Sequence, residues 1–479
     1  MATYYSTTTT PYVNAKPHIG MALELIQADA LARFHRIVGD EVVFNFGTDE
    51  HGQKIYQKAV EQGKTPQEYS DEYSAKFRLL KDALNLSYTN FIRTTDEHHV
   101  KAAQEFWKIC QENNDIYKKL YKIKYCVGCE LEKTDSELID GNCPLHPNLQ
   151  IQTYEEENYF FRFSNYQKEL LELYKKNPDF VVPAGKLNEI RSFVEQGLQD
   201  FSISRLKSKM PWGIDVPGDN DHVMYVWFDA LINYISTLGW PEDKKNFKKF
   251  WPVYQFAGKD QVRQQAAMWQ AMLFSARLPN SKQIFIHGFM TVDGQKISKS
   301  LGNTIDPIAV TREYGIDVLR YYLLAKIHPW EDSDFSWDKF KESYNADLAN
   351  GLGNLVSRVA KLCENAHYTL MGSANRVSGH IIGIEEYSKA LSEYRFNDAL
   401  ACVWEKISDA DKYIDEEKPW NLLKNGDERL KDVLAHCIDQ IQEIAGLLEP
   451  FLPETAKKIE EQYKGPEIKA TTPLFPRIA

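Results

Sequence analysis

The segment from Lys296 to Ser300 has the side chains needed to bind a polyphosphate. Lys296 and Lys299 stand three residues apart after Gly294, and Ser298 and Ser300 add two hydroxyl groups. In an extended loop, both ammonium groups can neutralise the β- and γ-phosphates of a nucleotide and the pyrophosphate that leaves it. A basic surface loop without a ligand is the alternative that this segment alone leaves open.

A second phosphate-binding element is predicted at Pro17-His18-Ile19-Gly20. The segment stands where a helix should begin, and a helix N-terminus offers free amides and the positive end of the helix dipole to an anion. Gly20 lets a nucleotide approach the backbone, and His18 can stabilise the charge that develops on the α-phosphorus. By itself His18 is more typical of a helix cap, but with the basic segment it predicts a split site for ATP.

Four residues have the types and spacing of a zinc site. Cys126 and Cys129 form a C-x-x-C pair, Cys143 and His146 form a C-x-x-H pair, and thirteen residues separate the pairs. Tetrahedral zinc takes four such ligands, and a site filled by four protein side chains is structural, not catalytic. The alternative is four unligated residues.

Asp260 follows a predicted strand in Gly258-Lys259-Asp260. At the carboxyl end of a parallel strand its carboxylate can accept hydrogen bonds from ribose hydroxyls. A cap for the next helix is the alternative reading.

Asn354 and Arg358 are one helical turn apart, and Trp420 follows Pro419 at an expected helix start. Exposed together, these side chains can stack on and hydrogen-bond unpaired bases. A buried tryptophan and a solvated Asn and Arg are the ordinary alternative.

The elements that position these residues begin with a strand-helix-strand unit. Residues 4–10 read as a buried strand, 18–36 as a helix that is apolar around every face, and 41–46 as a second strand. A right-handed crossover makes the two strands parallel, so residues 10–12 and 47–52 open onto the same sheet edge, where ligands bind.

The rest of the chain predicts an insertion, a completed sheet and a helical bundle. Short strand pieces are expected around residues 126–146 and at 159–163, and strands at 223–228, 253–258 and 283–288 are expected to complete the parallel sheet. Beyond Tyr344 the apolar residues repeat at helical spacing: Leu348, Leu352, Leu355, Val359 and Leu362.

The predicted fold is therefore α/β. A doubly wound parallel-sheet (Rossmann-like) domain carries a zinc-knuckle insertion and is followed by an all-α helical bundle. The expected boundaries are 1–115 and 221–290 for the two halves of the sheet domain, 116–220 for the insertion, 291–345 for the basic loop region and 346–479 for the bundle.

Composition sets limits on function without choosing one. The chain has 479 residues, 43% hydrophobic content, seven cysteines and a net charge of −11, which disfavours nonspecific coating of nucleic acid. No apolar run is long enough to cross a membrane, and the N-terminal residues show no signal peptide. We expect a cytoplasmic, monomeric enzyme with reduced thiols.

The ordered set of motifs resembles a class I methionyl-tRNA synthetase over almost the whole chain. It comprises the His18 segment, Gly47-Thr48-Asp49-Glu50-His51-Gly52, the zinc quartet, Tyr225-Val226-Trp227-Phe228-Asp229-Ala230 and the Lys296 segment. Asn354-Leu355-Val356-Ser357-Arg358 and Lys418-Pro419-Trp420 resemble the anticodon-reading helices of that family. The single knuckle resembles the one-zinc form, and the chain resembles the core that lacks a C-terminal appendix.

The resemblance implies a two-step reaction. The carboxylate of L-methionine attacks the α-phosphate of ATP–Mg²⁺, and the aminoacyl group then passes to the 3′ end of tRNA(Met). It implies catalytic roles for His18, Lys296 and Lys299, and an ATP site that includes Gly20, Gly258, Asp260, Ser298 and Ser300. The implied amino-acid site consists of Thr10, Pro11, Tyr12, Asp49, Arg205, Trp227, Ala230, Tyr234, Gln265 and Trp269.

Several positions depart from the family's pattern. Met21 replaces the second histidine of the H-I-G-H tetrapeptide. Thr10 stands where Leu or Ile is usual, and Gln264 and Gln265 stand where an apolar or aromatic residue and a His are expected. These residues predict a more polar pocket that still takes methionine.

Two other functions fit parts of the pattern. A class I synthetase paralogue of shifted amino acid specificity would explain the polar pocket, and a non-catalytic tRNA-binding protein would explain the fold. Asn354, Arg358 and Trp420 argue against the first, and the retained His18 and Lys299 argue against the second.

Overall fold

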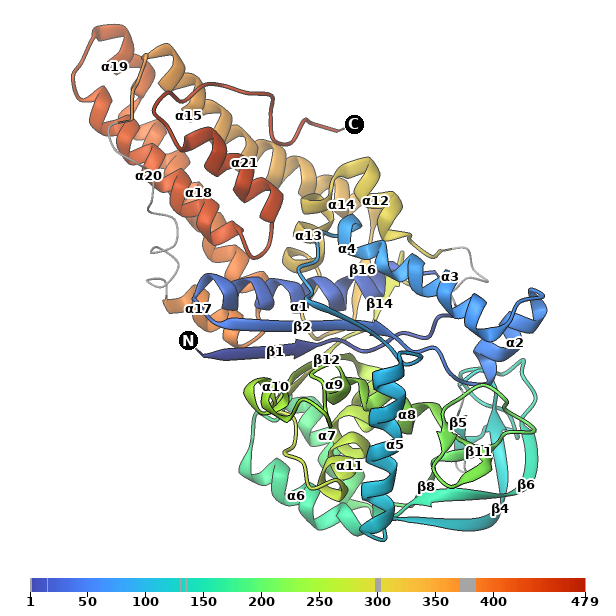
Figure 1. Ribbon diagram of the computed structural model, residues 1–479. Coiled ribbons are helices and arrows are strands. Elements are labelled where there is room, and N and C mark those ends of the chain that lie inside the picture. Colours follow the sequence, from blue (N-terminus) through green and yellow to red (C-terminus); the bar gives the residue numbers. More distant parts are fainter. Residues whose placement is uncertain are drawn as a thin grey trace.

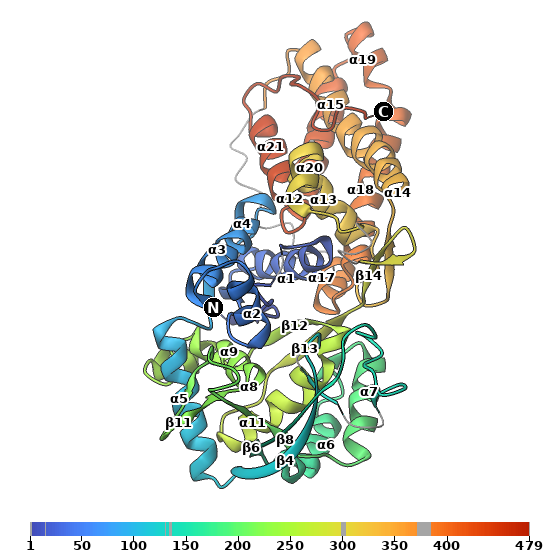
Figure 2. The ribbon, with the colours of Figure 1, turned by 90° about the vertical axis from the view of Figure 1, so that its right-hand side faces the viewer.

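The computed structural model shows a central α/β body with a helical bundle on one side and a small β-sheet insertion on the other (Figures 1 and 2). The structure describes residues 2–14, 16–129, 131–133, 137–297, 303–370 and 385–478. In Figure 1 the bundle lies at the top, the central sheet in the middle and the insertion at the lower right.

The central sheet has six strands in the order β3-β2-β1-β12-β13-β7, and every neighbouring pair is parallel. The strands are β1 (Thr3–Thr7), β2 (Glu41–Thr48), β3 (Asn90–Arg93), β7 (Val181–Val182), β12 (Tyr254–Gly258) and β13 (Gln283–His287). Strand order reverses between β1 and β12, so ligands are expected in the crevice beyond the carboxyl ends of these two strands. The predicted doubly wound sheet is confirmed.

The packing of helix α1 (Ile19–Ile37) explains why its sequence is apolar around every face. One side packs on β1 and β2, and another packs on α13 (Ile316–Ala325), so the helix lies between the sheet and the chain that leads to the bundle. On the other side of the sheet lie α5 (Glu97–Glu112) and α11 (Trp269–Ser275) (Figure 1).

The insertion is built on two long antiparallel strands, where the sequence predicted short pieces. β4 (Ile116–Cys126) and β6 (Gln152–Phe161) pair along their length, from Ile116 opposite Phe161 to Tyr125 opposite Gln152. β5 (Leu131–Glu132) and β8 (Phe201–Ser202) complete a four-stranded sheet. Charged residues on these strands hide the apolar alternation that marks a strand.

The prediction that residues 223–228 form a strand of the parallel sheet is wrong. β11 (Asp219–Met224) pairs antiparallel with β9 (Ser204–Leu206) and β10 (Asp215–Val216) in a separate sheet, and residues 226–231 form helix α8 (Val226–Leu231). A short apolar run fits a buried helix as well as a buried strand.

A third small sheet follows β13. β14 (Met290–Val292) pairs with β15 (Gln295–Lys296) in an antiparallel hairpin and with β16 (Ser333–Phe335) in parallel. The remaining helices of the α/β part are α2 (Gln53–Glu61), α3 (Pro66–Arg78), α4 (Leu80–Ala83), α6 (Gln167–Lys176), α7 (Ala184–Glu195), α9 (Asn233–Ser236), α10 (Lys244–Phe250) and α12 (Pro307–Tyr314). Short irregular helices are η2 (Phe163–Tyr166), η3 (Lys259–Gln261) and the π-helix η4 (Gln264–Met268).

The predicted helical bundle is confirmed. Its described helices are α14 (Trp337–Ser343), the π-helix η5 (Tyr344–Gly353), α15 (Asn354–Asn365), α17 (Glu385–Ser392), α18 (Phe396–Glu417), α19 (Pro419–Asn425), α20 (Leu430–Leu448) and α21 (Pro453–Tyr463). The apolar repeat packs inward as expected: Leu348, Leu352, Leu355 and Val359 are buried, and Leu362 is partly buried.

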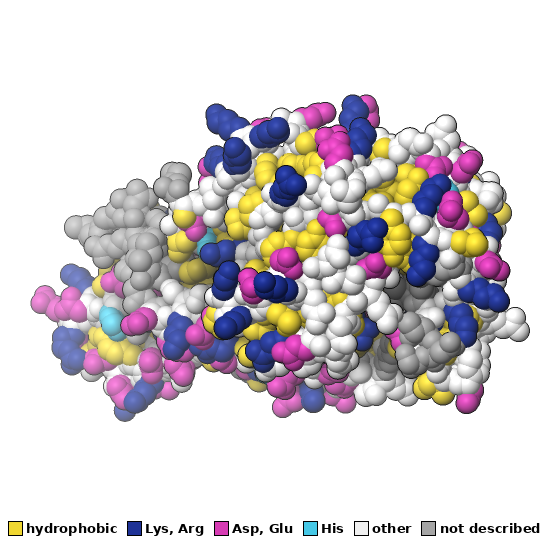
Figure 3. Space-filling model, turned by 90° about the horizontal axis from the view of Figure 1, so that it is seen from below, with side chains coloured by type: hydrophobic (Ala, Val, Ile, Leu, Met, Phe, Trp, Pro, Cys, Tyr) yellow, Lys and Arg dark blue, Asp and Glu magenta, His cyan; other side chains and the backbone are white. Residues whose placement is uncertain are grey.

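The surface in Figure 3 carries basic and acidic side chains that alternate over the face formed by the α/β body and the insertion. No single sign of charge dominates this face, in keeping with the modest net charge. Among the helices that the structure describes, none is both long enough and apolar enough to cross a lipid bilayer.

Candidate active site

A cavity of 540 Å³ lies beyond the carboxyl ends of β1, β2, β12 and β13, at the reversal point of the sheet. Predicted residues from six separate segments of the chain meet in its wall: Thr10, Pro11, Tyr12, His18, Gly20, Asp49, Trp227, Ala230, Tyr234, Gly258, Asp260, Gln264 and Gln265. Met21, which departs from the family pattern, lines it as well.

Asp49 is held in this wall by the chain segments that leave β1 and β2. Its backbone N–H donates to Pro11 O at 3.0 Å, and its carbonyl accepts from Val13 N at 3.2 Å, which pairs Asp49 with Tyr12 in a parallel bridge. Asp49 is only 3% exposed. A buried carboxylate at a cavity wall is suited to binding a cationic group of the ligand, such as an α-ammonium.

His18 caps helix α1 at the edge of the cavity. Its backbone is extended (φ −135°, ψ 169°), and the next residue donates its N–H to Ile305 O at 3.1 Å. A Cβ at Gly20 would lie 3.3 Å from both Cε1 and Nδ1 of the His18 ring. The ring therefore rests against Gly20, and the missing side chain there leaves room for it.

Three ionisable residues that the sequence did not single out also line the cavity: Glu24, His287 and Asp332. Glu24, on α1, accepts from the N–H and the hydroxyl of Thr9, each at 2.7 Å, and its other oxygen lies 2.9 Å from His287 Nε2. His287 Nδ1 donates to Gly288 O at 2.8 Å. Glu24 is 6% exposed and His287 7%, so this is a buried pair.

The partners of His287 determine its protonation. A carbonyl oxygen and a carboxylate oxygen both accept, so both ring nitrogens carry hydrogen when both bonds are made. Burial alone would lower the pKa of His287, but the hydrogen bond to Glu24 and the charge of that carboxylate outweigh burial and raise the pKa above its ordinary value. The cavity wall thus holds a buried histidine whose protonated form is favoured by the side chain of Glu24.

Gly258 and Asp260 lie together at the end of β12. A Cβ at Gly258 would be 2.8 Å from Asp260 Oδ1, so the carboxylate folds over the glycine. Neighbouring Lys259 forms an ion pair with Asp332, which comes from the segment before β16 and also lines the cavity. The end of β12 thus presents the carboxylate of Asp260 to the cavity, and its Lys259 holds a second carboxylate, that of Asp332, by an ion pair.

The apolar part of the cavity is formed by Trp227, Ala230 and Tyr234, from α8 and α9. Trp269 does not line it. That side chain is fully buried behind the wall, edge-on to Tyr234 with ring centroids 5.9 Å apart. Its place in the core makes Trp269 a support for Tyr234.

Arg205 does not line the cavity either. Its Nη1 donates to Ser202 Oγ at 2.8 Å and to Ser204 O at 2.7 Å, and its guanidinium stands 4.3 Å from the centre of the Tyr225 ring. Tyr225 is the N-cap of α8, so Arg205 packs against the start of the helix that carries Trp227 and Ala230.

The basic segment is described only at its beginning. The backbone of Lys296 pairs with Thr291 in the β14–β15 hairpin, whose turn contains Gly294 at φ +72°. Ile297, the next residue, lines the cavity. Ser298, Lys299 and Ser300, and the side chain of Lys296, lie outside the described part of the chain.

The four zinc-type residues are brought together at the end of β4. Cys129 Sγ lies 3.4 Å from Cys143 Sγ and 3.2 Å from His146 Nδ1, and all four candidate donor atoms lie within 4.8 Å of one another. A tetrahedron with metal–sulfur bonds of about 2.3 Å has edges of about 3.8 Å, so these separations fit one zinc ion. Gly128 is required there, because a Cβ would lie 2.4 Å from the His146 ring.

The three predicted base-binding residues come from two helices of the bundle. Arg358, on α15, lies 5.1 Å from the centre of the Trp420 ring on α19, and it forms ion pairs with Asp411 at 3.7 Å and with Asp415. Trp420 is 41% exposed, and Asn354 is exposed one turn before Arg358. An aromatic ring in solvent beside a cation is suited to stacking on a base.

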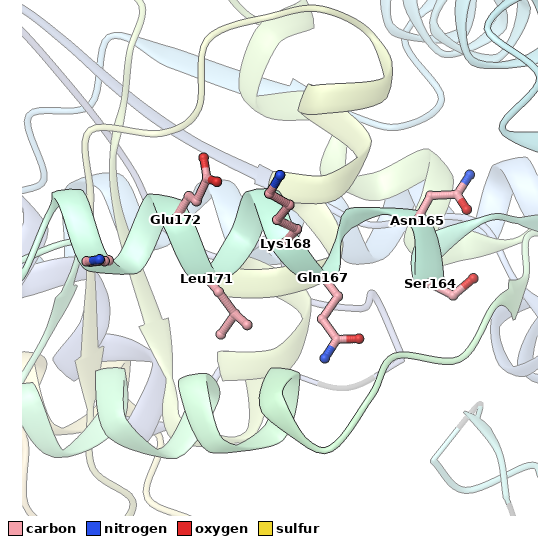
Figure 4. Close-up of a pocket in the computed structure, with 7 residues that line it drawn as sticks. Ser164, Asn165, Gln167, Lys168, Leu171 and Glu172 are labelled. Atoms are coloured by element: carbon pink, nitrogen blue, oxygen red, sulfur yellow. The ribbon is translucent and has the colours of Figure 1, made fainter.

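A second hollow of 460 Å³ lies along α6, apart from these sites (Figure 4). Figure 4 shows Lys168 and Glu172 on one side of the helix and Gln167 and Leu171 on the other. None of the residues that line this hollow is buried. It lacks the converging buried polar groups of the central cavity.

Comparison with known proteins shows which families have similar sequences. Residues 4–153 and 147–360 match the family of class I tRNA synthetases described as "tRNA synthetases class I (M)", and residues 383–478 match the anticodon-binding domain of tRNA ligases. A methionine–tRNA ligase of Thermotoga maritima is 42% identical over 95% of this chain and 74% of its own length. One from a Nostoc species is 42% identical over 96% of this chain and 89% of its own length.

Solved structures agree. Methionyl-tRNA synthetase of Mycobacterium tuberculosis in complex with methionyl-adenylate is 36% identical, with a TM-score of 0.92 over 100% of both chains. The free form of that enzyme gives a TM-score of 0.85 at 34% identity, over 100% of this chain and 99% of its own. On the strength of these matches and of the site geometry, the chain belongs to the methionine–tRNA ligases, which are class I tRNA synthetases and enzymes.

Proposed function

We propose that the 540 Å³ cavity activates L-methionine with ATP–Mg²⁺ and that the chain then transfers the methionyl group to tRNA(Met). The observation that carries the proposal is the meeting, in one wall, of a buried carboxylate at Asp49, a helix-capping histidine at His18 and an apolar recess at Tyr234. These groups suit the ammonium, the α-phosphate and the side chain of one amino acid that is being adenylated.

In this proposal Asp49 binds the α-ammonium and thereby directs the amino acid carboxylate toward the α-phosphorus. His18 and the amides at the start of α1 stabilise the charge that develops on the phosphate, without transferring a proton. Lys296, Lys299, Ser298 and Ser300 would neutralise and hydrogen-bond the departing pyrophosphate, and Mg²⁺ bound with ATP would supply further positive charge there. Asp260 accepts from the ribose, and Gly20 and Gly258 let the nucleotide lie close to the backbone.

The side chain of methionine occupies the recess of Trp227, Ala230 and Tyr234, with Gln265 at its base and Thr10, Pro11 and Tyr12 along the edge. A flexible, polarisable thioether packs well against aromatic rings. Arg205 and Trp269 act from behind the wall, by supporting the start of α8 and the Tyr234 ring.

Cys126, Cys129, Cys143 and His146 would hold one structural zinc ion. When bound, the ion supplies a crosslink that fixes the end of the β4–β6 hairpin. Gly128 and the short approach of Cys129 to His146 support this assignment.

Asn354, Arg358 and Trp420 are proposed to read the tRNA anticodon, since they are presented on the face of the bundle by α15 and α19. We further propose a monomeric enzyme that works in the cytoplasm.

The test is ATP–pyrophosphate exchange with each of the twenty amino acids. Methionine should support exchange far better than any other, and Asp49→Asn should raise the KM for methionine about a hundredfold, because a charge-assisted bond is lost from a buried site. Asp338→Asn, on the surface helix α14, is the matched control. Exchange that depends on another amino acid would favour the paralogue of shifted specificity, and no exchange at all would favour the non-catalytic tRNA-binding protein.

The anticodon assignment is tested separately with Trp420→Ala. Loss of one stacking contact, about 1–3 kcal/mol, should lower kcat/KM for aminoacylation by roughly ten- to a hundredfold and leave pyrophosphate exchange unchanged. Leu120→Ala, which removes another exposed apolar side chain far from the bundle, serves as control.

A further inference from the structure

Behind the apolar recess lies a row of buried amides and hydroxyls that is connected end to end. Gln270, Ser281, Gln255, Gln265 and Tyr234 are all at most 6% exposed. Polar side chains in this number are costly to bury unless every one is satisfied, so the row requires an explanation of its own.

The hydrogen bonds of Gln270 fix the first amide. Gln270 Oε1 accepts from the backbone N–H of Ser281 at 3.1 Å, and Gln270 Nε2 donates to the backbone carbonyl of Gln265 at 2.8 Å. Backbone groups cannot exchange the roles of donor and acceptor. The oxygen and nitrogen of this amide are therefore assigned by the fold itself.

The assignment of Gln270 fixes which group donates and which accepts in each of the next hydrogen bonds of the row. Gln270 Nε2 also donates to Ser281 Oγ at 3.0 Å, and the Ser281 hydroxyl donates to Gln255 Oε1 at 2.5 Å. Gln255 Nε2 then donates to Gln265 Oε1 at 2.8 Å, and Gln265 Nε2 donates to the Tyr234 hydroxyl oxygen at 2.8 Å. We call this set, Gln270-Ser281-Gln255-Gln265, the amide relay.

The opposite direction is less favourable. If the amides of Gln255 and Gln265 were turned over, Tyr234 would donate to Gln265 and the Ser281 hydroxyl proton would face only a donor inside the core. A buried donor without an acceptor costs about 1–3 kcal/mol. In the observed direction, the hydrogen that is not donated within the row is that of the Tyr234 hydroxyl group. Tyr234 lines the cavity, where a ligand can accept this hydrogen.

We infer that the amide relay is a positioning device that commits the Tyr234 hydroxyl to donate its proton to the amino acid side chain in the cavity. This inference rests on the proposed function. The side chain of methionine has one heteroatom, the thioether sulfur, which accepts hydrogen bonds weakly and donates none. The relay therefore selects for sulfur over an isosteric methylene group, and Gln255, Gln270 and Ser281 contribute to specificity without touching the cavity.

The test reverses the relay from a distance. In Gln255→Glu, a carboxylate accepts from both Ser281 and Gln265, so the Gln265 amide turns over and takes the Tyr234 proton. The measured quantity is the ratio of kcat/KM for methionine to kcat/KM for norleucine, which has a methylene group in place of sulfur, in pyrophosphate exchange. The ratio should fall about three- to tenfold, the worth of one neutral hydrogen bond.

A second background shows whether the effect passes through Tyr234. Tyr234→Phe should lower the same ratio, and adding Gln255→Glu to Tyr234→Phe should then change it no further. An equal fall caused by Gln255→Glu in both backgrounds would overturn the inference, because the substitution would then act by general distortion. An unchanged ratio in Gln255→Glu alone would overturn it as well.

An uncharged variant covers the case in which a buried carboxylate at position 255 prevents folding. Ser281→Ala removes the donor that sets the direction, so both orientations of the relay become possible and the ratio should fall about two- to threefold. A ratio that stays constant in folded Ser281→Ala would overturn the inference. Absence of methionine-dependent exchange in the unsubstituted chain would instead contradict the proposed function, so the two failures are distinct.

Discussion

At the scale of single residues, the cavity wall combines buried ionisable side chains with glycines that bring the backbone close to neighbouring groups. Asp49, Glu24 and His287 are buried ionisable residues in one wall. Backbone bonds hold the main chain of Asp49, and the side chains of Glu24 and His287 each bond a backbone group. Buried charges of this kind are expensive unless paired, and they are typical of sites that bind a charged ligand.

The pair of Glu24 and His287 leads to a pH prediction. Because the folded pKa of His287 is raised above 6.5, the pair's contribution to stability is complete below pH 6.5 and is lost as pH rises through the folded pKa. Glu24→Gln should lower the pKa of His287 below 6.5, since burial remains and the carboxylate charge is gone. Titration of the histidine ring protons by NMR measures both values.

The control for this titration is Glu342→Gln, an exposed glutamate of α14. It should leave the His287 titration unchanged. A His287 midpoint that is the same in Glu24→Gln as in the unsubstituted chain would show that Glu24 does not set it.

Gly20 leads to a prediction about catalysis. Gly20→Ala places a methyl group 3.3 Å from the His18 ring and should displace it by a few tenths of an ångström. Small misplacements of catalytic groups are costly, so kcat/KM for exchange should fall about ten- to a hundredfold without loss of fold. In Gly185→Ala, the control, the new methyl group meets no atom within 4 Å. Full activity in Gly20→Ala would mean that the ring position is not limiting.

Most of the cavity wall could be predicted from sequence because motifs mark it: His18, Asp49, Asp260 and Tyr234 all line it. Glu24 and His287 were missed because neither belongs to a short motif that could be read from local spacing. One signal was available, since Glu24 stands in a helix that is apolar around every face, and a carboxylate there must have a buried partner. The partner lies far along the chain and emerges only when β13 joins the sheet.

At the scale of elements, the fold was predictable where strands are long and apolar and unpredictable where they are short or charged. β7 contains two residues, too few for a periodic signal, and β4 carries four lysines along eleven residues. The mistaken strand at residues 223–228 has a different cause. Its apolar run continues from β11 into α8, so one sequence pattern covers the end of a strand and the start of a helix.

The zinc-type quartet is an element whose order should depend on its metal. Cys129→Ser, or treatment with a chelator, should release one zinc ion per chain and make residues 126–146 sensitive to proteolysis, because metal binding supplies the folding energy of such short loops. Zinc content by atomic absorption and limited proteolysis measure the two effects. The β4–β6 ladder should survive, since its pairing extends far from the quartet.

Cys402→Ser, on α18 in the bundle, is the matched control and should retain both zinc and protease resistance. Protease resistance of Cys129→Ser equal to that of this control would contradict a structural role for the metal.

At the scale of the whole molecule, one buried side chain joins the α/β body to the bundle. Arg320, on α13, is fully buried; it pairs with Asp29 of α1 at 2.8 Å and donates to the carbonyls of Phe451 at 2.7 Å and Pro450 at 3.1 Å, just after α20. Burial alone would raise the pKa of Asp29, but the charges of Arg320 and Arg33 outweigh it and lower the pKa below its ordinary value.

Arg320→Leu should lower the free energy of unfolding by about 3–5 kcal/mol, because it leaves Asp29 buried without its main partner. The unsubstituted chain should lose stability as pH falls below 3.8, where the unfolded chain takes up the Asp29 proton first, and this dependence should be weaker in the variant, in which Arg33 and Ser87 remain as partners of Asp29. Thermal and denaturant unfolding at several pH values measure both. Arg312→Leu, at an exposed position of α12, should change neither, and equal stability of the two variants would contradict the assignment.

Asp29 and His18 belong to the same rigid rod. α1 begins directly after His18, and Asp29 lies eleven residues further along, a distance of roughly 16 Å at the helical rise. In mechanical terms α1 resembles a lever, with one end at the proposed phosphate site and a pivot where Arg320 joins Asp29 to the bundle. A tilt of the bundle about that pivot would change the angle at which the His18 ring faces the cavity.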